Sequence, residues 1–141
     1  MSLNLNQMKN LYQQSIKTLQ ARADKIFSEF IRRRDTPGGI GKCCTCGKFI
    51  TYETCDAGHW QSRGLKNTRY NGLNVAAQCI SCNRFQEGRK DRHRDFIEKK
   101  YGISKRYLIE SLAHQKCTDY KFLLINVIEN YTIEVEELRK Q

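Results

Sequence analysis

Two cysteine pairs constrain this chain more than any other feature of its sequence. Cys43 and Cys46 form one Cys-x-x-Cys motif, and Cys79 and Cys82 form a second. Each motif makes a tight turn that offers two thiolates, and four thiolates complete the tetrahedral shell of a structural Zn²⁺. Cys44 adjoins Cys43, but only Cys43 leaves the usual two-residue spacing to Cys46. The sequence therefore predicts a small fold built around one zinc ion.

The other cysteines fit the same interpretation. No apolar N-terminal run resembles a signal peptide, and no stretch approaches the ~18 apolar residues of a membrane span. We therefore expect a protein of the reducing cytoplasm, whose cysteines bind metal and do not form disulfides. Cys44, Cys55 and Cys117 are left over, and we expect them to act as small buried apolar side chains.

Charge points to a polyanionic partner. The 141 residues carry a net charge of +10, and 39% of them are hydrophobic, enough for one modest core. The segment from Trp60 to Arg106 contains twelve basic and four acidic residues, so most of the chain's excess positive charge lies around the metal motif in the sequence. This distribution predicts salt-sensitive binding of nucleic-acid phosphates. We expect six cations to contact them: Arg63, Lys66, Arg69, Arg84, Arg89 and Lys90. The alternative is that these are solvated surface side chains.

The N-terminal segment, residues 1–36, predicts one long helix over residues 5–34. Apolar residues recur at alternating steps of four and three, and Pro37-Gly38-Gly39 ends the pattern. The stripe consists of Tyr12, Ile16, Leu19, Ala23, Ile26 and Phe30. Such a helix must pack along other helices of the chain or form a homodimer seam, and both alternatives remain open. The arginines at its end, residues 32–34, are expected to be solvated or to meet a phosphate.

The rest of the chain predicts an α+β fold. In the core, residues 37–102, we expect a strand over residues 49–52, with residues 56–60 as its partner or as the entry to that partner, and a basic loop at residues 61–72. A helix is expected to start near residue 83, with a break at Gly88 and an end at Gly102.

The C-terminal region, residues 103–141, reads as helical. We expect one helix over residues 105–115 capped by Ser104, and a last helix that begins after Thr118 or Asp119.

Between the cysteine pairs lie residues suited to phosphodiester hydrolysis. This reaction needs a base to activate water, a divalent cation beside the phosphate and a basic surface. His59 can act as the base, and Asp56 and Asn83 carry the hard oxygen ligands that Mg²⁺ or Mn²⁺ prefers. A zinc ion held by four thiolates is coordinatively closed, so a second ion would perform the chemistry.

The order of these residues resembles a known nuclease class. Gly58-His59, Asn74 and the run from Cys79 to Asn83 resemble the HNH (ββα-metal) endonucleases, and the arrangement is similar to the phage junction resolvase endonuclease VII. The resemblance is closer to the lambda NinG/Rap recombination endonucleases, over residues 43–102. It is carried by Asp56-Ala57-Gly58-His59, Ser62-Arg63-Gly64, Asn71, Asn74 and residues 77–85.

The resemblance implies a zinc-stabilised ββα-metal core and a DNA endonuclease of phage or prophage recombination, acting in the bacterial host cell on D-loops and Holliday junctions. His59 would be the general base, Asn74 would orient it, and Asn83 would bind the catalytic cation. One position departs from the pattern. Many HNH enzymes carry Asp or His directly before the base, where this chain has Gly58, and Asp56 is either the substitute ligand or a turn residue.

Plainer interpretations stand beside these. His59 can be a structural histidine or a zinc ligand, and Asn83 can be a helix N-cap. Trp60 and Phe85 are expected to pack in the core and not to stack on bases. We therefore predict an HNH-type endonuclease that acts on branched DNA. The alternatives are a non-catalytic zinc-containing DNA-binding module and a structural adaptor assembled through the long helix.

Overall fold

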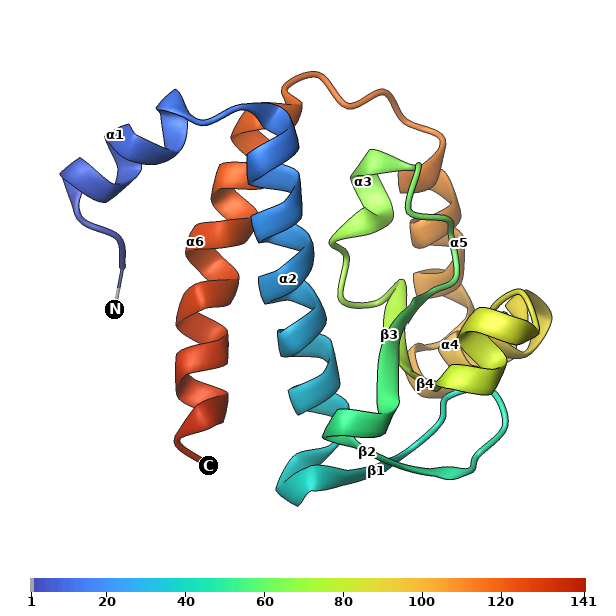
Figure 1. Cartoon of the computed structure of the whole chain (residues 1–141). Coiled ribbons are helices and arrows are strands. Elements are labelled where there is room, and N and C mark those ends of the chain that lie inside the picture. The colour runs from blue at the N-terminus through green and yellow to red at the C-terminus, as the bar shows by residue number, and fades with distance from the viewer. Residues whose placement is uncertain (1) are drawn as a thin grey trace. The chain divides into compact units, whose positions relative to one another are not determined.

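The computed structural model describes residues 2–141, which divide into two units (Figure 1). One unit comprises the described residues up to Phe30 together with Cys117–Gln141, and the other comprises Ile31–Lys116. The chain is an α+β protein whose small antiparallel sheets both lie in the second unit. Within residues 2–141 no helix combines the length and the apolar character that crossing a membrane requires.

The first unit contains helices α1 (Leu5–Gln13) and α6 (Tyr120–Arg139) and the first part of α2 (Ile16–Asp35). The prediction of one continuous helix over residues 5–34 is wrong. Gln14 has an extended backbone, with ψ at 152°, and the Ser15 hydroxyl accepts a hydrogen bond from the Thr18 amide at 3.1 Å. This local cap starts a new helix, because it satisfies an amide that a continuous helix would bond to its own backbone.

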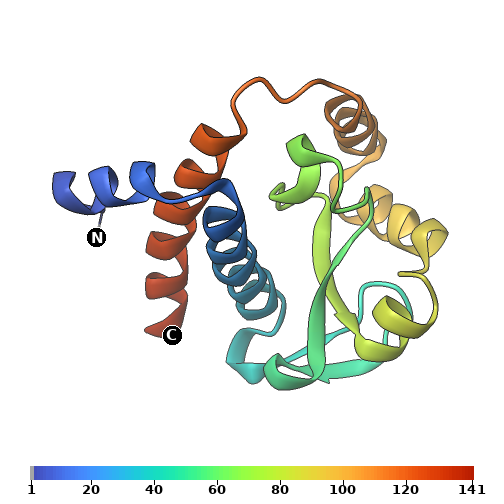
Figure 2. The same cartoon turned by 45° about the horizontal axis from the view of Figure 1, so that its top comes forward.

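The apolar stripe of α2 packs against α6 within this unit. Leu19 and Ala23 are fully buried, and the ring of Phe27 lies 4.9 Å from that of Tyr131. Both views show the two helices side by side (Figures 1 and 2). The intramolecular brace is therefore present, whereas Tyr12 and Ile16 of the predicted stripe are about half exposed, at 48% each. A homodimer through this segment remains a prediction.

The helix α6 begins where the sequence predicts. The side chain of Asp119 accepts a hydrogen bond from the Phe122 amide at 3.0 Å, which makes Asp119 the N-cap. At the other end of α6, Arg139 forms an ion pair of 2.8 Å with Glu29 of α2.

The second unit is built on two antiparallel hairpins. Strand β1 (Ile40–Lys42) pairs with β2 (Phe49–Thr51), and β3 (Cys55–His59) pairs with β4 (Val75–Cys79). The predicted pairing of residues 49–52 with residues 56–60 is wrong. The short 3-10 turn η2 (Tyr52–Thr54) separates β2 from β3, and each strand pairs with a partner outside this segment.

Helices complete the second unit: η1 (Pro37–Gly39), α3 (Lys66–Arg69), the π-helical turn η3 (Ser81–Phe85), α4 (Lys90–Tyr101) and α5 (Ile103–Ala113). Gly102, with φ at 94°, ends α4 as predicted. The helix α5 starts directly after this glycine, so the predicted cap at Ser104 is wrong.

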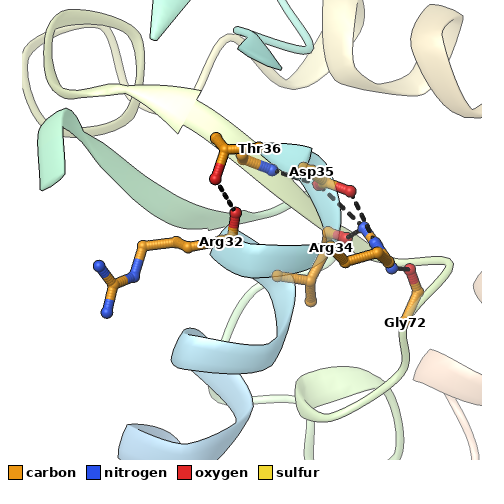
Figure 3. Close-up of polar contacts among 7 residues, drawn as sticks. Arg32, Arg34, Asp35, Thr36 and Gly72 are labelled. Carbon is orange, nitrogen blue, oxygen red and sulfur yellow. Dashed lines mark hydrogen bonds and ion pairs between the residues drawn. The ribbon is translucent and has the colours of Figure 1, made fainter. Parts of the chain in front are cut away.

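The core of this unit is fixed to the end of α2. Arg34 donates to the carbonyls of Gly72 and Val75 at 2.8 and 2.9 Å and pairs with Asp35, whose carboxylate accepts the Ala77 amide at 2.8 Å (Figure 3). These bonds tie α2 to β4 and to the loop that precedes it. The expectation of a solvated or phosphate-bound end is therefore wrong for Arg34. Arg32 likewise lies over the Tyr52 ring, 4.4 Å from its centroid.

Candidate active site

Four thiols meet where the two hairpins approach each other. The sulfur atoms of Cys43, Cys46, Cys79 and Cys82 all lie within 4.8 Å of one another, and those of Cys46 and Cys79 are 3.9 Å apart. A zinc tetrahedron with bonds of 2.3 Å has edges of about 3.8 Å. The cluster therefore fits a structural Zn²⁺, with the predicted ligands and without Cys44.

Hydrogen bonds favour ionisation of one of the four thiols, whereas burial raises the pKa of Cys46 and of Cys79. The Cys82 amide donates to the sulfur of Cys79 at 3.4 Å. Burial opposes ionisation of Cys43, but hydrogen bonds, the largest from Thr45, lower the pKa of its thiol to about 6. Burial raises the pKa of Cys44, and it raises that of Cys55 to about 11. These two thiols stay protonated at neutral pH, as inert cysteines do. Cys55 is buried as the sequence predicts, whereas Cys44 and Cys117 are only partly buried, so the expectation of burial is wrong for these two.

His59 ends strand β3 and is separate from the thiol cluster. Its Nε2 atom lies 2.8 Å from the carbonyl oxygen of Arg69, which can only accept a hydrogen bond. Nε2 therefore carries the proton, and Nδ1 keeps its lone pair. Burial lowers the pKa of His59 to about 4; the Arg69 bond opposes this shift, and the charges of Arg63, Lys90 and Arg69 add to it. The imidazole is neutral at pH 7 and able to accept a proton.

Asn74 braces the loop that holds His59. It is fully buried, and its Oδ1 atom accepts the Gln61 amide at 2.7 Å. Its Nδ2 atom donates to the carbonyls of Gln61 and Thr68 at 3.1 and 3.0 Å. Because Thr68 directly precedes Arg69, Asn74 fixes the backbone that accepts the His59 proton. It acts on the imidazole through this loop and not by a direct bond.

Asp56, near the start of β3, meets Asn83 of η3. The amide of Asn83 donates to the carboxylate of Asp56 at 3.0 Å, and Arg84 bonds both carboxylate oxygens at 2.8 Å. The Arg84 guanidinium holds the pKa of Asp56 below its ordinary value; burial opposes this shift, and Asn83 supports it. A carboxylate beside a carboxamide oxygen is a donor set that suits Mg²⁺ or Mn²⁺.

Gly58 shows why Asp56 is the available carboxylate. A Cβ atom on Gly58 would lie 1.9 Å from Oε1 of Gln78, a fully buried side chain. Gln78 is held in place because its Nε2 atom donates to Thr45 Oγ1 at 3.1 Å and to the Gly88 carbonyl at 2.8 Å. Asp56 lies two residues from Gly58 and so shares its face of the strand. The sequence motif contained Gln78, but its role depends on the strand register.

A basic residue at the start of α4 contacts the end of β3. The ammonium group of Lys90 donates to the backbone carbonyl of His59, and burial at that end lowers the pKa of Lys90. Lys90 also lines an open hollow of about 430 Å³ together with Gln86, Arg89, Asp91 and Arg92. In the basic loop, Arg63 and Lys66 are exposed, while Arg69 is partly buried and donates to the Arg63 carbonyl at 2.7 Å.

His93 is a buried residue that the sequence did not single out. It lies one turn into α4 and is fully buried, and neither ring nitrogen has a hydrogen-bond partner within residues 2–141. Burial lowers its pKa to about 3, and the charges of Lys90 and His59 add to the shift. Nothing in the sequence marks it, because it stands in a charged run from Arg89 to Asp95.

Comparison with known proteins identifies one family. The model of a family described as "Bacteriophage Lambda NinG protein" matches residues 4–141. No curated protein and no solved structure matches the chain.

Proposed function

The chain belongs to the bacteriophage lambda NinG family, and from this premise we propose that it is an HNH-type, metal-dependent DNA endonuclease. Its proposed substrates are branched recombination intermediates, such as D-loops and Holliday junctions, formed by phage DNA in the bacterial host cell. One observation carries the proposal. His59 is neutral and oriented by the Arg69 carbonyl, and Asp56, Asn83 and a basic rim belong to the same hairpin-and-helix unit.

His59 would remove a proton from the attacking water. The Arg69 carbonyl holds the proton on Nε2, so Nδ1 is unprotonated and can accept the proton of the water. Asn74 is the positioning residue, because its three hydrogen bonds fix the loop that contains Arg69. Because the Asn74 side chain is buried, the orientation that it gives the His59 imidazole should not change when DNA binds.

Asp56 and Asn83 would hold the divalent cation. When bound there, Mg²⁺ or Mn²⁺ would neutralise the scissile phosphate and the leaving oxygen. The Asp56 carboxylate is already ionised, because Arg84 keeps its pKa low. Arg84 would then move toward a phosphate when the cation takes its place on the carboxylate.

Cations on the surrounding elements would hold the DNA backbone. Arg89, Lys90 and Arg92 line the open hollow at the start of α4, where phosphates can lie, and Arg63 and Lys66 extend the basic surface. Because these contacts are electrostatic, binding would weaken steeply as salt is added.

The test is a cleavage assay on four-way junctions, D-loops and linear duplex in Mg²⁺ and in Mn²⁺. Wild type is expected to cut branched DNA, and His59→Ala should lose at least about a hundredfold in rate, the usual contribution of a general base. Zinc content and DNA binding should persist in this variant. His114→Ala, which changes an exposed histidine at the end of α5, is the matched control. Equal cleavage by His59→Ala and wild type would refute the proposed role.

A second candidate is a non-catalytic zinc-containing DNA-binding module. The observation in its favour is that Arg84 and Asn83 already satisfy the Asp56 carboxylate, as in a purely structural ion pair. Wild type that binds DNA with salt-sensitive affinity but cuts no substrate in either metal would establish this candidate in place of the nuclease.

A further inference from the structure

Phe85 is exposed where the sequence led us to expect a core residue. Its side chain is 79% exposed, whereas Trp60, expected in the core on the same grounds, is only 8% exposed. Leaving a phenylalanine in water forgoes the favourable free energy of burying its apolar surface. Single exposed apolar residues are common, so exposure alone carries no function. The position of this ring and the hydrogen bonds that fix its turn carry the argument.

The turn that displays Phe85 is fixed at several points. It lies in η3, three residues after the zinc ligand candidate Cys82. The Gly88 amide donates to the Cys82 carbonyl at 2.9 Å, and Gln86 bonds the Ser81 hydroxyl at 2.9 Å. Arg84 is held by both oxygens of Asp56. A ring presented from such a turn loses little entropy when it binds a partner.

The surroundings of the ring match a nucleic acid. In the sequence Phe85 lies between Arg84, which pairs with Asp56, and Gln86, which lines the hollow. The other lining residues of the hollow are three cations and one carboxylate: Arg89, Lys90, Arg92 and Asp91. Cations that follow phosphates, interleaved with an aromatic ring that stacks on bases, are the combination by which proteins hold unpaired strands. Asn83, the proposed cation ligand, lies only two residues before the ring.

We propose that Phe85 stacks on an unpaired base at the branch point of the DNA, beside the phosphate to be cut. This inference rests on the proposed nuclease function and adds how a branch is selected. Inside a continuous duplex each base is already stacked on both sides, and opening a step costs free energy. At a branch a base face is exposed without that cost. The ring therefore favours branched over linear DNA.

The experiment uses His59→Ala protein, which keeps the DNA intact, and a three-way junction with 2-aminopurine at the branch. Phe85 is expected to quench the fluorescence of this base on binding. Phe85→Ala should abolish the quenching and weaken junction binding about tenfold, in line with the stacking contribution of one base. Binding of linear duplex should change less than twofold. Phe85→Trp should restore both signals, and Phe85→Leu should not.

The matched control is Phe49→Ala, which removes a ring that is 72% exposed on β2 and should leave quenching unchanged. Zinc content verifies that each variant is folded. The inference is overturned if Phe85→Ala binds and quenches like its parent, or if it alters only self-association measured by light scattering. Ring-dependent quenching with a wild type that never cuts DNA would preserve this inference and refute the nuclease. Branched-DNA cleavage that is unchanged in Phe85→Ala would support the nuclease and refute this inference.

Discussion

Arg84 grips both carboxylate oxygens of Asp56, Nε to Oδ2 and Nη2 to Oδ1, each at 2.8 Å. Asn83 donates to the same carboxylate at 3.0 Å. Arg84 and Asn83 belong to η3, and Asp56 belongs to β3. These hydrogen bonds therefore join the turn at the second cysteine motif to the hairpin. The guanidinium thus stands where a divalent cation would bind the carboxylate.

Arg84→Gln is therefore expected to bind Mn²⁺ several-fold more tightly than wild type in the absence of DNA. The arginine and the metal compete for the same two oxygens, and the substitution removes the competitor without adding a charge. Titration of zinc-loaded protein with Mn²⁺, followed by electron paramagnetic resonance, measures the change. Asp56→Asn should nearly abolish the binding. Weaker Mn²⁺ binding by Arg84→Gln would show that the arginine supports the site and does not compete for it.

Asn74→Ala is expected to lower the free energy of unfolding by about 2–4 kcal/mol. The substitution leaves the partly buried amide and carbonyl of Gln61 without their hydrogen bonds, and each unsatisfied group costs about 1–3 kcal/mol before relaxation. The Thr68 carbonyl loses one bond and keeps the bond from the Asn71 amide at 3.2 Å. Urea unfolding of zinc-loaded protein measures this loss. Asn126→Ala removes an exposed bond to the Phe122 carbonyl and should cost under about 0.5 kcal/mol. Equal effects of the two substitutions would deny Asn74 its bracing role.

Gly58→Ala tests the close approach of Gln78. The added methyl group would overlap Oε1 of Gln78, and this side chain cannot easily move because its Nε2 atom makes two hydrogen bonds. We therefore expect a loss of about 1–3 kcal/mol in unfolding free energy. Gly64→Ala, where the nearest atom lies 3.9 Å away, should be close to neutral. In the background of Gln78→Ala, the Gly58→Ala change should cost markedly less. Strict additivity of the two changes would rule out the contact as the cause.

Stability is expected to fall as the pH is lowered from 7.5 to 5. His93 and His59 have folded-state pKa values of about 3 and about 4, below the 6.5 of an unfolded histidine. The unfolded chain therefore binds more protons in this range, and the stability present above pH 6.5 is lost toward pH 4. Each residue contributes up to about 2 kcal/mol of this loss by pH 5.

His93→Leu should remove about half of that pH dependence, because the unfolded variant no longer has the histidine that binds one of the two protons. At pH 7.5 the substitution should be neutral or stabilising, since it removes two buried nitrogens without partners. Urea unfolding at both pH values measures the difference, with zinc content monitored so that metal release is recognised. An unchanged pH dependence would mean that His93 does not titrate on unfolding.

Local spacing predicted the features that depend on neighbouring residues. The cysteine quartet followed from two short motifs, and the Asp119 cap followed from a side chain that bonds an amide three residues on. The break at Gln14–Ser15 was missed because the apolar stripe continues through it and a single cap residue outweighs the stripe there.

Features that depend on distant residues were beyond the sequence. Strand β3 pairs with β4, and the long loop between them prevents prediction of their register from the sequence. Without the register, neither the close approach of Gln78 to Gly58 nor the burial of Gln78 can be predicted. Phe85 is the last residue of a π-helical turn that ordinary helical periodicity does not describe, so its exposure was not predicted.

The account rests on two separate ion sites in one small unit, and anomalous diffraction from crystals soaked in Mn²⁺ tests it most directly. We predict a zinc peak among the sulfur atoms of Cys43, Cys46, Cys79 and Cys82. We also predict a separate manganese peak bonded to the Asp56 carboxylate and the Asn83 carboxamide oxygen, with Arg84 turned away. Manganese found only among the four thiols, or absent while Arg84 still grips Asp56, would contradict the account.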